Sequence, residues 1–594
     1  MLALPAVLAG GCRMARPATM STTTPATAGA GAANPVLSAL ADEYWDKRLE
    51  GEPIEATLIG ERRFDDRMPD PSPEANVAEI ARLKALAGRV STIEVGALGT
   101  ADRVTRAALL GEIDGEIAAR ECAINEWAVD PRDGPQVALL NLAHLQTVKD
   151  PAQGRALVAR WQKMAAYLDG RAANLRRSLG DKRVATRESV ERVLGQLDQL
   201  LARPSSQWVL AEPARIAHPD WSEADRKALK EGVERAVESS IRPAFTRYRD
   251  VIRKQILPQA RGDQQVGVGH IPGGKECYEK LIRVHTSLSL PAAQIHQIGL
   301  EENAKIRAEM IALGRKLFGT GDLAAIQQRL RSDKALYFTT REQVEAKAAE
   351  ALRRAEAAMP RWFGEIARTP CVVKRVEAYE EKDTTIAYYR QPAVDGSRPG
   401  TYYINTYAPE TRPRYEAEAL AFHESVPGHH TQIALAQEQT ELPEFRKHLG
   451  VTAYVEGWAL YTERLSEEMG LYSADLDRMG MLSFDAWRAS RLVVDTGLHA
   501  MGWDRQRAIQ YMLDNTALAK NNIENEVDRY IGWPGQALAY KLGQREIFAL
   551  RHQAQQQLGP RFDIRAFHDN ILAHGAVSLP VLREEIERWI AASK

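Results

Sequence analysis

The stretch Tyr415–Gln437, YEAEALAFHESVPGHHTQIALAQ, gathers His423, Glu424, His429 and His430 into eight residues of an apolar, alanine-rich segment. A histidine followed at once by a glutamate, with another histidine further along the same helix, is typical of a zinc site. In such a site the imidazoles bind the ion, and the carboxylate takes a proton from water. We therefore expect a metal-binding helix here, and we interpret the rest of the chain around it.

The spacing of these histidines departs from the usual motif. In H-E-x-x-H the second histidine lies four residues after the first, and here that position is Pro427. On a straight helix, with about 100° and about 1.5 Å per residue, neither His429 nor His430 lies beside His423. Because Pro427 cannot donate a backbone hydrogen bond and Gly428 tolerates unusual torsions, we expect the helix to bulge. Looping out two residues brings His429 to the second ligand position, whereas looping out three brings His430 there.

Catalysis by zinc also needs a third ligand, a base and a donor to the developing oxyanion. Glu456, in AYVEGWALYTE, lies in an apolar helical run, where a buried carboxylate needs a counter-charge such as a metal ion. Glu424 is the expected general base. Tyr530 and Tyr540, in DRYIGWPGQALAYKLG, are candidate neutral donors, although tyrosines at helical spacing are as often part of a core.

Three other polar residues are candidates for contacts with a ligand or the substrate. Asp495 and His499 are four residues apart in VVDTGLHAMGW and could orient a metal ligand. A structural hydrogen bond is the alternative that we favour for this pair. Arg529 precedes Tyr530 in the tyrosine-containing segment and could contact the substrate.

The length of 594 residues exceeds what one compact core supports, so we expect two lobes. Helical periodicity fills residues 37–260, which we interpret as a helical lobe, and returns in residues 261–594, which contain the candidate metal site. Within residues 371–407, β-branched and aromatic residues predict one small sheet beside the metal-binding helix. With 78 basic and 79 acidic side chains and no long run of one sign, the sequence argues against a nucleic-acid partner.

The N-terminus indicates export. Residues 1–12, MLALPAVLAGGC, resemble a signal peptide ending in a lipobox, in which Cys12 would be lipidated, and residues 13–36 are typical of a flexible tether. A plain secretory signal is the alternative. We thus expect a periplasmic protein that reaches the membrane only through an N-terminal lipid anchor. The other cysteines, Cys122, Cys277 and Cys371, allow at most one disulfide among them.

Several motifs together resemble the bacterial domain-of-unknown-function family 885 (DUF885). They are PGGKECYEKLIRVHTS, HESVPGHH, VEGWALY, VVDTGLHAMGW and RYIGWPGQALAYKLG, in that order along the chain. The resemblance implies a mainly α, two-lobed fold similar to neurolysin-type oligopeptidases and thermostable carboxypeptidases. The family motif H-E-x-x-P-G-H falls on His423, Glu424 and His429, and its E-G-W falls on Glu456. It therefore implies His429 as the second ligand, with His430 as the fallback.

The function we expect is that of a zinc metallopeptidase that holds one Zn²⁺ per chain and hydrolyses short peptides. A peptide substrate could add to an edge strand of the small sheet, for which we predict residues Thr401–Tyr407. One alternative is a zinc-dependent amidase acting on cell-wall or acyl-amino-acid amides. Another is a non-catalytic, peptide-binding lipoprotein of the envelope.

Overall fold

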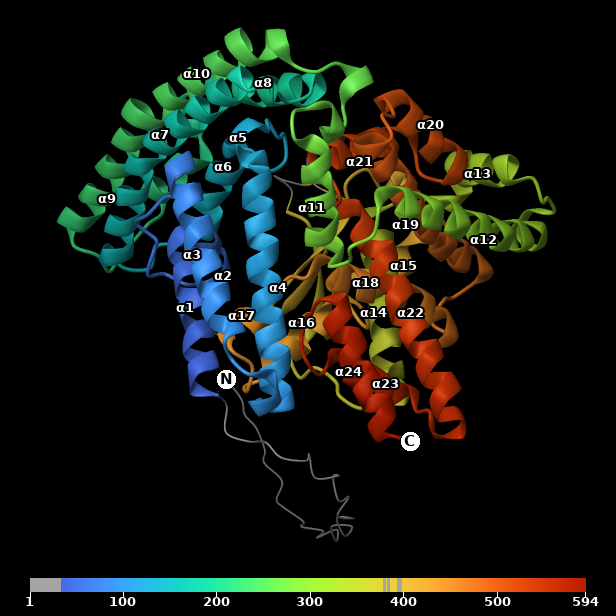
Figure 1. Ribbon diagram of the computed structural model, residues 1–594. Helices are drawn as coiled ribbons and strands as arrows, with labels where there is room; N and C mark the ends of the chain where they lie inside the picture. The colour runs from blue at the N-terminus through green and yellow to red at the C-terminus, as the bar shows by residue number, and fades with distance from the viewer. Residues whose placement is uncertain (1–33, 378–380, 382–384, 393–397) are drawn as a thin grey trace, which may run out of the picture.

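The computed structural model describes residues 34–377, 381, 385–392 and 398–594, and these are mainly helical with one three-stranded sheet (Figure 1). This confirms the predicted fold class in its coarse form. The expected signal peptide and lipobox, and all but the last residues of the expected tether, lie outside the described residues. Within the described ranges, no helix is both long and apolar enough to cross a bilayer.

In the described part of the first half of the chain, from residue 34 onward, the regular elements are all helices (blue to green in Figure 1). Their apolar residues recur at helical spacing, and capping residues set their starts; Asp150, for example, accepts a hydrogen bond from the backbone N–H of Gln153 at the beginning of the longest one. The helices are α1 (Pro35–Gly51), α2 (Pro53–Ile59), α3 (Pro73–Ser91), α4 (Thr100–Cys122), α5 (Ile124–Trp127), α6 (Pro135–Leu145), α7 (Pro151–Gly180), α8 (Arg187–Ala202), α9 (Glu223–Ala236) and α10 (Arg242–Val251).

Two apolar clusters hold these helices together. One lies among α6 to α10 and includes Trp161 and Phe245. The other lies among α1, α3 and α4, and it also takes in Phe445 from the second half of the chain. Val104 of α4 belongs to the large core of that second half. The lobe boundary at residue 260 stays a prediction, and two helices before it contact helices after it: α1 packs on α17, and α4 packs on α11.

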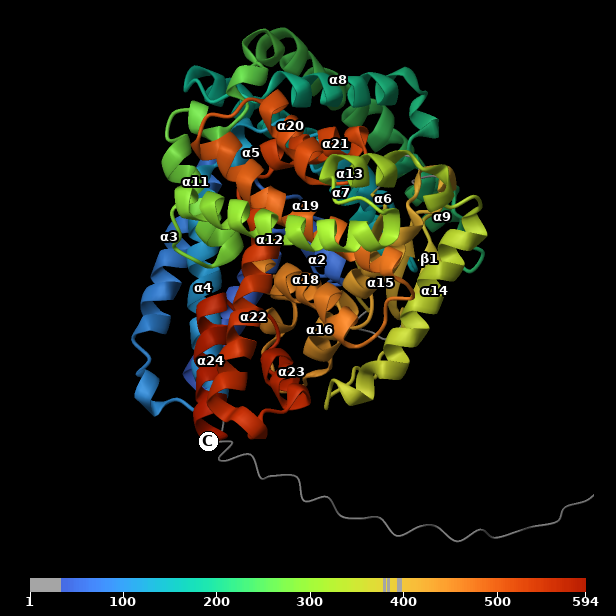
Figure 2. The ribbon, with the colours of Figure 1, turned by 90° about the vertical axis from the view of Figure 1, so that its right-hand side faces the viewer.

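The second half surrounds α19 (Asp475–Ala500), a long helix that is buried along most of its length. α12 (Ala292–Phe318) lies along it (Figure 2), and α15 (Ala417–Glu424), α18 (Thr452–Glu468) and α22 (Ala539–Leu558) also pack on it. The remaining helices are α11 (Gly274–Thr286), α13 (Leu323–Ser332), α14 (Arg341–Ala358), α16 (His429–Glu438), α17 (Glu444–Lys447), α20 (Arg505–Asn515), α21 (Lys520–Gly532), α23 (Ile564–Leu572) and α24 (Leu579–Ala592).

The small sheet has the order β1 (Cys371–Arg375), β3 (Gly400–Ile404), β2 (Ala387–Arg390). β3 pairs with β1 in parallel and with β2 in antiparallel orientation, so both of its edges are occupied. The prediction that residues Thr401–Tyr407 form an edge strand is therefore wrong. The prediction fails because β3 lies in the centre of the sheet. Every residue of β3 is buried, as expected for a central strand covered on both faces.

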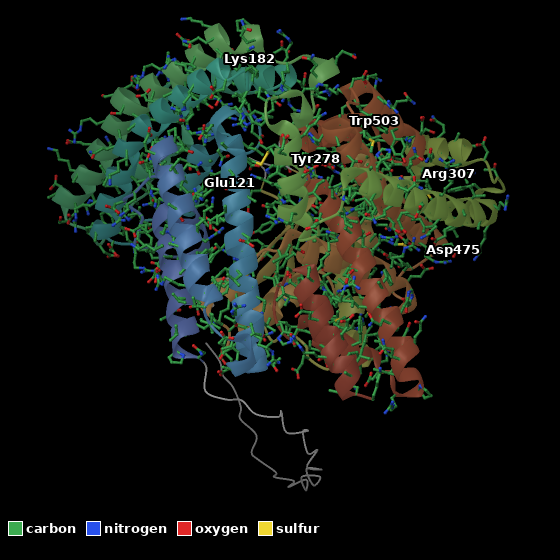
Figure 3. All side chains as sticks on the ribbon, viewed as in Figure 1. Glu121, Lys182, Tyr278, Arg307, Asp475 and Trp503 are labelled. Atoms are coloured by element: carbon green, nitrogen blue, oxygen red, sulfur yellow. A yellow bond between two sulfur atoms is a disulfide. The ribbon has the colours of Figure 1, made fainter. Side chains whose placement is uncertain are left out.

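A disulfide links the end of α4 to α11 through Cys122 and Cys277, and it is visible as a yellow bond between the labelled Glu121 and Tyr278 (Figure 3). Cys371 is free and buried in β1. The glycine-rich segment that leads into α11 packs tightly against the end of α19, since a Cβ on Gly267 would lie 1.8 Å from the carbonyl oxygen of Leu498. This connection is therefore fixed to the core of the second half.

Candidate metal centre

The turn at Pro427 breaks the predicted metal-binding helix in two, where we expected a bulge. α15 ends before it and α16 starts directly after it, at His429. The chain folds back so closely that a Cβ on Gly428 would lie 2.0 Å from the carbonyl oxygen of His423, which only glycine permits. The indole N–H of Trp458 donates a 3.0 Å hydrogen bond to the Pro427 carbonyl and holds the turn against α18.

This turn brings His423 and His429 together with Glu456 of α18. The Nε2 atoms of His423 and His429 lie 3.5 Å and 3.6 Å from Oε2 of Glu456. One ligand atom from each residue lies within 4.8 Å of the others. A tetrahedral ion with ligands about 2.1 Å away separates them by about 3.4 Å, so these distances suit zinc.

The electrostatics of the cluster also suit a cation. Oε2 of Glu456 is buried and has no hydrogen-bond partner among the residues that the structure describes. Burial alone would raise the pKa of Glu456, but His423 and His429 outweigh it and lower the pKa to about 2. Desolvation lowers the pKa of His429 to about 4, which keeps this imidazole neutral. A neutral imidazole beside an ionised carboxylate is the state in which both bind metal.

Glu463 is a site residue that the sequence analysis missed. Its Oε1 lies 2.8 Å from Nδ1 of His423, so the carboxylate fixes the ring proton on Nδ1 and leaves Nε2 directed at Glu456. Burial lowers the pKa of His423, but the neighbouring Glu456 and Glu463 overcome this and raise the pKa to about 9, so a metal ion would displace a proton from Nε2 on binding. Arg488 of α19 lies 3.5 Å from the same Oε1. The signal in the sequence was the seven-residue separation of Glu456 and Glu463, which places both on one face of a helix.

Glu424, the predicted base, is the last residue of α15 and keeps part of its surface exposed. Burial raises the pKa of its carboxyl to about 7, with a further increase from Glu456 and an opposing effect from His423. Glu424 therefore lies close enough to the cluster for their charges to interact.

His430, the fallback ligand, points away from the cluster. Its Nδ1 lies 2.9 Å from the hydroxyl of Tyr389 in β2, and its Nε2 lies 3.0 Å from the carbonyl oxygen of Thr369. Both ring nitrogens thus have partners at the sheet. Of the two adjacent histidines, the structure brings His429 to His423 and Glu456.

A close contact between two helices brings Tyr540 towards the cluster. A Cβ on Gly457 would lie 2.5 Å from the Cα of Gly543, so the two glycines allow α18 and α22 to touch at the backbone. Tyr540 lies one turn before Gly543, and its pKa is raised by burial and by the charge of Glu456. Its hydroxyl accepts a 3.4 Å hydrogen bond from Gln536.

Tyr530 has a different environment from Tyr540. Its hydroxyl donates to Oε2 of Glu526 at 2.7 Å and accepts from the side chains of Trp487 and Arg491. These three contacts occupy the hydroxyl fully, as expected for a tyrosine in a core. Of the two predicted donors, Tyr540 is the one whose pKa is influenced by the charge of Glu456.

Asp495 and His499 make separate structural contacts and do not bond to each other. Asp495 accepts hydrogen bonds from the Tyr278 hydroxyl and the Gly535 amide. The ring of His499 accepts from the amide of Val268 and has its Nε2 2.9 Å from the Tyr530 carbonyl, so it anchors the connecting segment. Neither contacts a residue of the metal cluster. Arg529, the third candidate, pairs with Glu526 at 3.0 Å.

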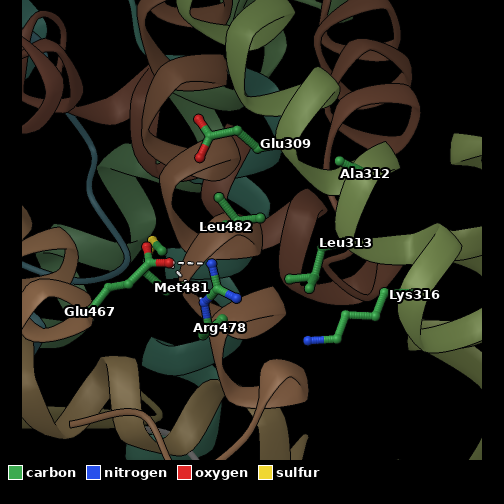
Figure 4. A pocket seen from close by; sticks show the side chains of 8 residues that line it. All are labelled: Glu309, Ala312, Leu313, Lys316, Glu467, Arg478, Met481 and Leu482. Carbon is green, nitrogen blue, oxygen red and sulfur yellow. Dashed lines mark hydrogen bonds and ion pairs between the residues drawn. The ribbon is translucent and has the colours of Figure 1, made fainter. Parts of the chain in front are cut away.

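Two surface pockets are lined by residues of α12, α18 and α19. The smaller has a volume of about 310 Å³ (Figure 4). The larger, of about 750 Å³, shares Glu309 and Glu467 with it and includes the buried pair Lys541 and Asp485. None of the predicted site residues lines either pocket. The smaller one is lined by Glu309, Ala312, Leu313, Lys316, Glu467, Arg478, Met481 and Leu482.

Comparison with known proteins supports the resemblance found in the sequence. The model of a family described as "Bacterial protein of unknown function (DUF885)" matches residues 53–586. The crystal structure of a "putative lipoprotein" from Colwellia psychrerythraea is similar, with a TM-score of 0.86 and 27% identity over 94% of this chain and 99% of that chain. A "putative lipoprotein of unknown function" from Shewanella oneidensis shares the fold, with a TM-score of 0.74 and 18% identity over 92% and 99%. None of the curated proteins matches the sequence.

Proposed function

Since the chain belongs to the DUF885 family, whose function is unknown, we propose its function from the site itself: a zinc-dependent metallopeptidase that hydrolyses short peptides. The observation that carries the proposal is the convergence of His423, His429 and Glu456, from three helices, with a buried carboxylate oxygen that lacks a partner. These three residues would hold the ion. Glu463 would keep His423 in the tautomer that binds it.

The residues around the cluster divide the work of hydrolysis. Zinc bound there would supply a Lewis acid for a water molecule and for the carbonyl of the substrate. Glu424 accepts the proton from the attacking water and passes it to the amine that leaves. The hydroxyl of Tyr540 donates to the carbonyl oxygen as negative charge develops on it. The role of Tyr540 is supported by the effect of the Glu456 charge on its pKa and by the close packing of α18 on α22 at Gly457 and Gly543.

Export to the envelope, with a lipid anchor at Cys12, is the location that we propose for this activity. Two observations support it. Two of the similar solved structures are each described as a "putative lipoprotein". The disulfide between Cys122 and Cys277 is also of a type that persists in oxidising compartments such as the periplasm.

The test is the metal content and peptide hydrolysis of the purified chain and its variants. We expect about one zinc per chain in the wild type and in Glu424→Gln, with hydrolysis reduced at least about 100-fold in the variant, because only the base is lost. His429→Ala should lose zinc, and His430→Ala should keep it. Glu444→Gln, an exposed residue of α17, serves as the control.

Two results would overturn the proposal. Zinc content that is the same in His429→Ala as in the wild type would remove the ligand assignment. Hydrolysis that is unchanged in Glu424→Gln would remove the base. A panel that includes acylated amino acids beside peptides separates a peptidase from an amidase, since both would use the same residues.

A further inference from the structure

A group of buried charges lies beside Tyr540. Arg491 of α19 and Arg529 of α21 share one carboxylate: Oε2 of Glu526 accepts hydrogen bonds of 3.0 Å from each guanidinium. Their side chains are only 5%, 14% and 16% exposed, respectively. Two positive charges against one negative charge leave an excess of one positive charge in a largely dry environment.

The neighbouring groups do not neutralise this excess. The other contacts of Arg491 are neutral, namely the Tyr530 hydroxyl and the rings of Trp487 and Tyr540. Arg529 donates its remaining hydrogen bond, of 2.7 Å, to the amide oxygen of Gln536. Arg132, between α5 and α6, brings no further net charge, because Asp130 lies close enough to compensate it.

Two other carboxyl groups, those of Asp495 and Glu456, are near, but neither compensates the excess positive charge. Asp495 interacts with Arg529, but its carboxylate accepts hydrogen bonds from Tyr278 and Gly535, and burial raises its pKa to about 7, which favours the neutral form. Glu456 interacts with Arg491, but in the proposed site its charge belongs to the metal. A buried guanidinium without a matching anion is costly, so the site is complementary to an anion from outside the chain.

Arg491 also has a free donor. Its Nη1 is buried and has no hydrogen-bond partner among the residues that the structure describes, whereas Nε and Nη2 both have one. The guanidinium lies over the ring of Tyr540, 4.3 Å from the ring centre. An anion bound at Arg491 would therefore be held next to the side chain that we place at the scissile carbonyl.

We propose that Arg491, supported by Arg529, binds the free carboxylate at the C-terminus of a peptide, so that the site hydrolyses peptide bonds close to that end. Guanidinium and carboxylate are matched in charge and geometry. The peptide chain advances about 3.5 Å per residue, so a terminal carboxylate lies within a few residues of the bond that is cut. This inference rests on the proposed peptidase function and adds its substrate class.

The experiment compares three N-acetylated peptides. The first is a free acid, the second is the C-terminal amide of the same sequence, and the third is that amide with one internal residue replaced by glutamate. Binding is measured by calorimetry with zinc-loaded Glu424→Gln, which does not turn the peptides over. We expect the acid to bind about 10- to 100-fold more tightly than the plain amide, the effect of one charge-assisted hydrogen bond. Equal affinity for acid and amide overturns the inference without any further variant. Tight binding of the glutamate-containing amide shows that a side-chain carboxylate is read instead, and overturns the assignment to the C-terminus.

Arg491→Met and Arg491→Lys, made in the Glu424→Gln background, test whether Arg491 is the carboxylate receptor, that is, the group that binds the terminal carboxylate. Arg491→Met should reduce the preference for the acid to within about threefold, and Arg491→Lys should reduce it only in part. Zinc content and circular dichroism should be unchanged in both variants. Arg551→Met is the matched control, because Arg551 is also a buried, ion-paired arginine but lies about 16 Å further along α22 from Tyr540. A preference that survives in Arg491→Met refutes the role of Arg491.

Hydrolysis of the same peptides by the chain with Glu424 intact separates the two proposals. If acid and amide are cleaved with equal kcat/KM, the peptidase stands and the carboxylate receptor fails. If the acid binds preferentially but the zinc-loaded chain with Glu424 intact cleaves neither peptide, the carboxylate receptor stands and the peptidase fails.

Discussion

Replacing Glu463 by glutamine should weaken zinc binding without changing the fold. In the structure Oε1 of Glu463 lies 2.8 Å from Nδ1 of His423, and the side chain is 1% exposed. Glutamine keeps an acceptor in the same place but removes the negative charge that opposes loss of the ring proton. A hydrogen bond to a charged group contributes about 1.5–3 kcal/mol, so we expect a 10- to 100-fold higher Kd for zinc.

The assay is competition for zinc against a chromophoric chelator, with circular dichroism as the check on folding. Glu468→Gln is the control, since Glu468 lies on the same helix but its exposed carboxylate pairs with Arg551 and not with a histidine. We expect wild-type affinity in that variant. A Kd for Glu463→Gln within about threefold of the wild-type value, in a folded protein, would refute the reasoning that this carboxylate supports the ligand.

Three other predictions concern the fold that supports the site. Serine at both Cys122 and Cys277 should lower the free energy of unfolding by about 5 kcal/mol, from the 155-residue separation that the disulfide closes; an unchanged denaturation midpoint would contradict this. Burial lowers the pKa of His499 to about 4, so the unfolded chain binds more protons than the folded one below pH 6.5, and up to about 3 kcal/mol of stability is lost as the pH falls towards 4. Thermal unfolding at pH 7.5 and 5 should show this loss, with a smaller fall for His499→Gln; an equal fall would count against it. Gly543→Ala should displace α22, because its Cβ would lie 1.8 Å from the carbonyl oxygen of Ala453, and should reduce both thermal stability and peptide hydrolysis; wild-type values of both would show that the contact is dispensable.

Much of the fold and the three proposed ligands could be predicted from the sequence. Helical periodicity extends over most of the chain, and the change to β-branched residues marked the sheet. The motif implied His429 over His430, and the structure places His429 beside His423 because Pro427 and Gly428 end one helix and let the next begin within a few residues. Spacing alone left both histidines open, since it says nothing of how sharply the chain turns.

Other features depend on contacts that sequence patterns do not carry. The order of the strands is set by which segment pairs with both neighbours, and a short run such as Gly400–Ile404 has the same pattern at an edge as at the centre. The partners of Asp495 and His499 come from residues more than 30 positions away in the chain. Gly457 is conspicuous beside Glu456, but its role becomes visible only with the backbone of Gly543 against it.

The disulfide between Cys122 and Cys277 affects how the chain would withstand proteolysis in the envelope location that we propose. It joins the end of α4 to α11, so that residues 122–277, which include α5 to α10, form a covalently closed ring. Hydrolysis of one peptide bond within this ring, for example near the exposed Ile216, opens the ring but releases no fragment. In the envelope location that we propose, where other peptidases act, the chain would thereby keep its two halves attached after a first cut.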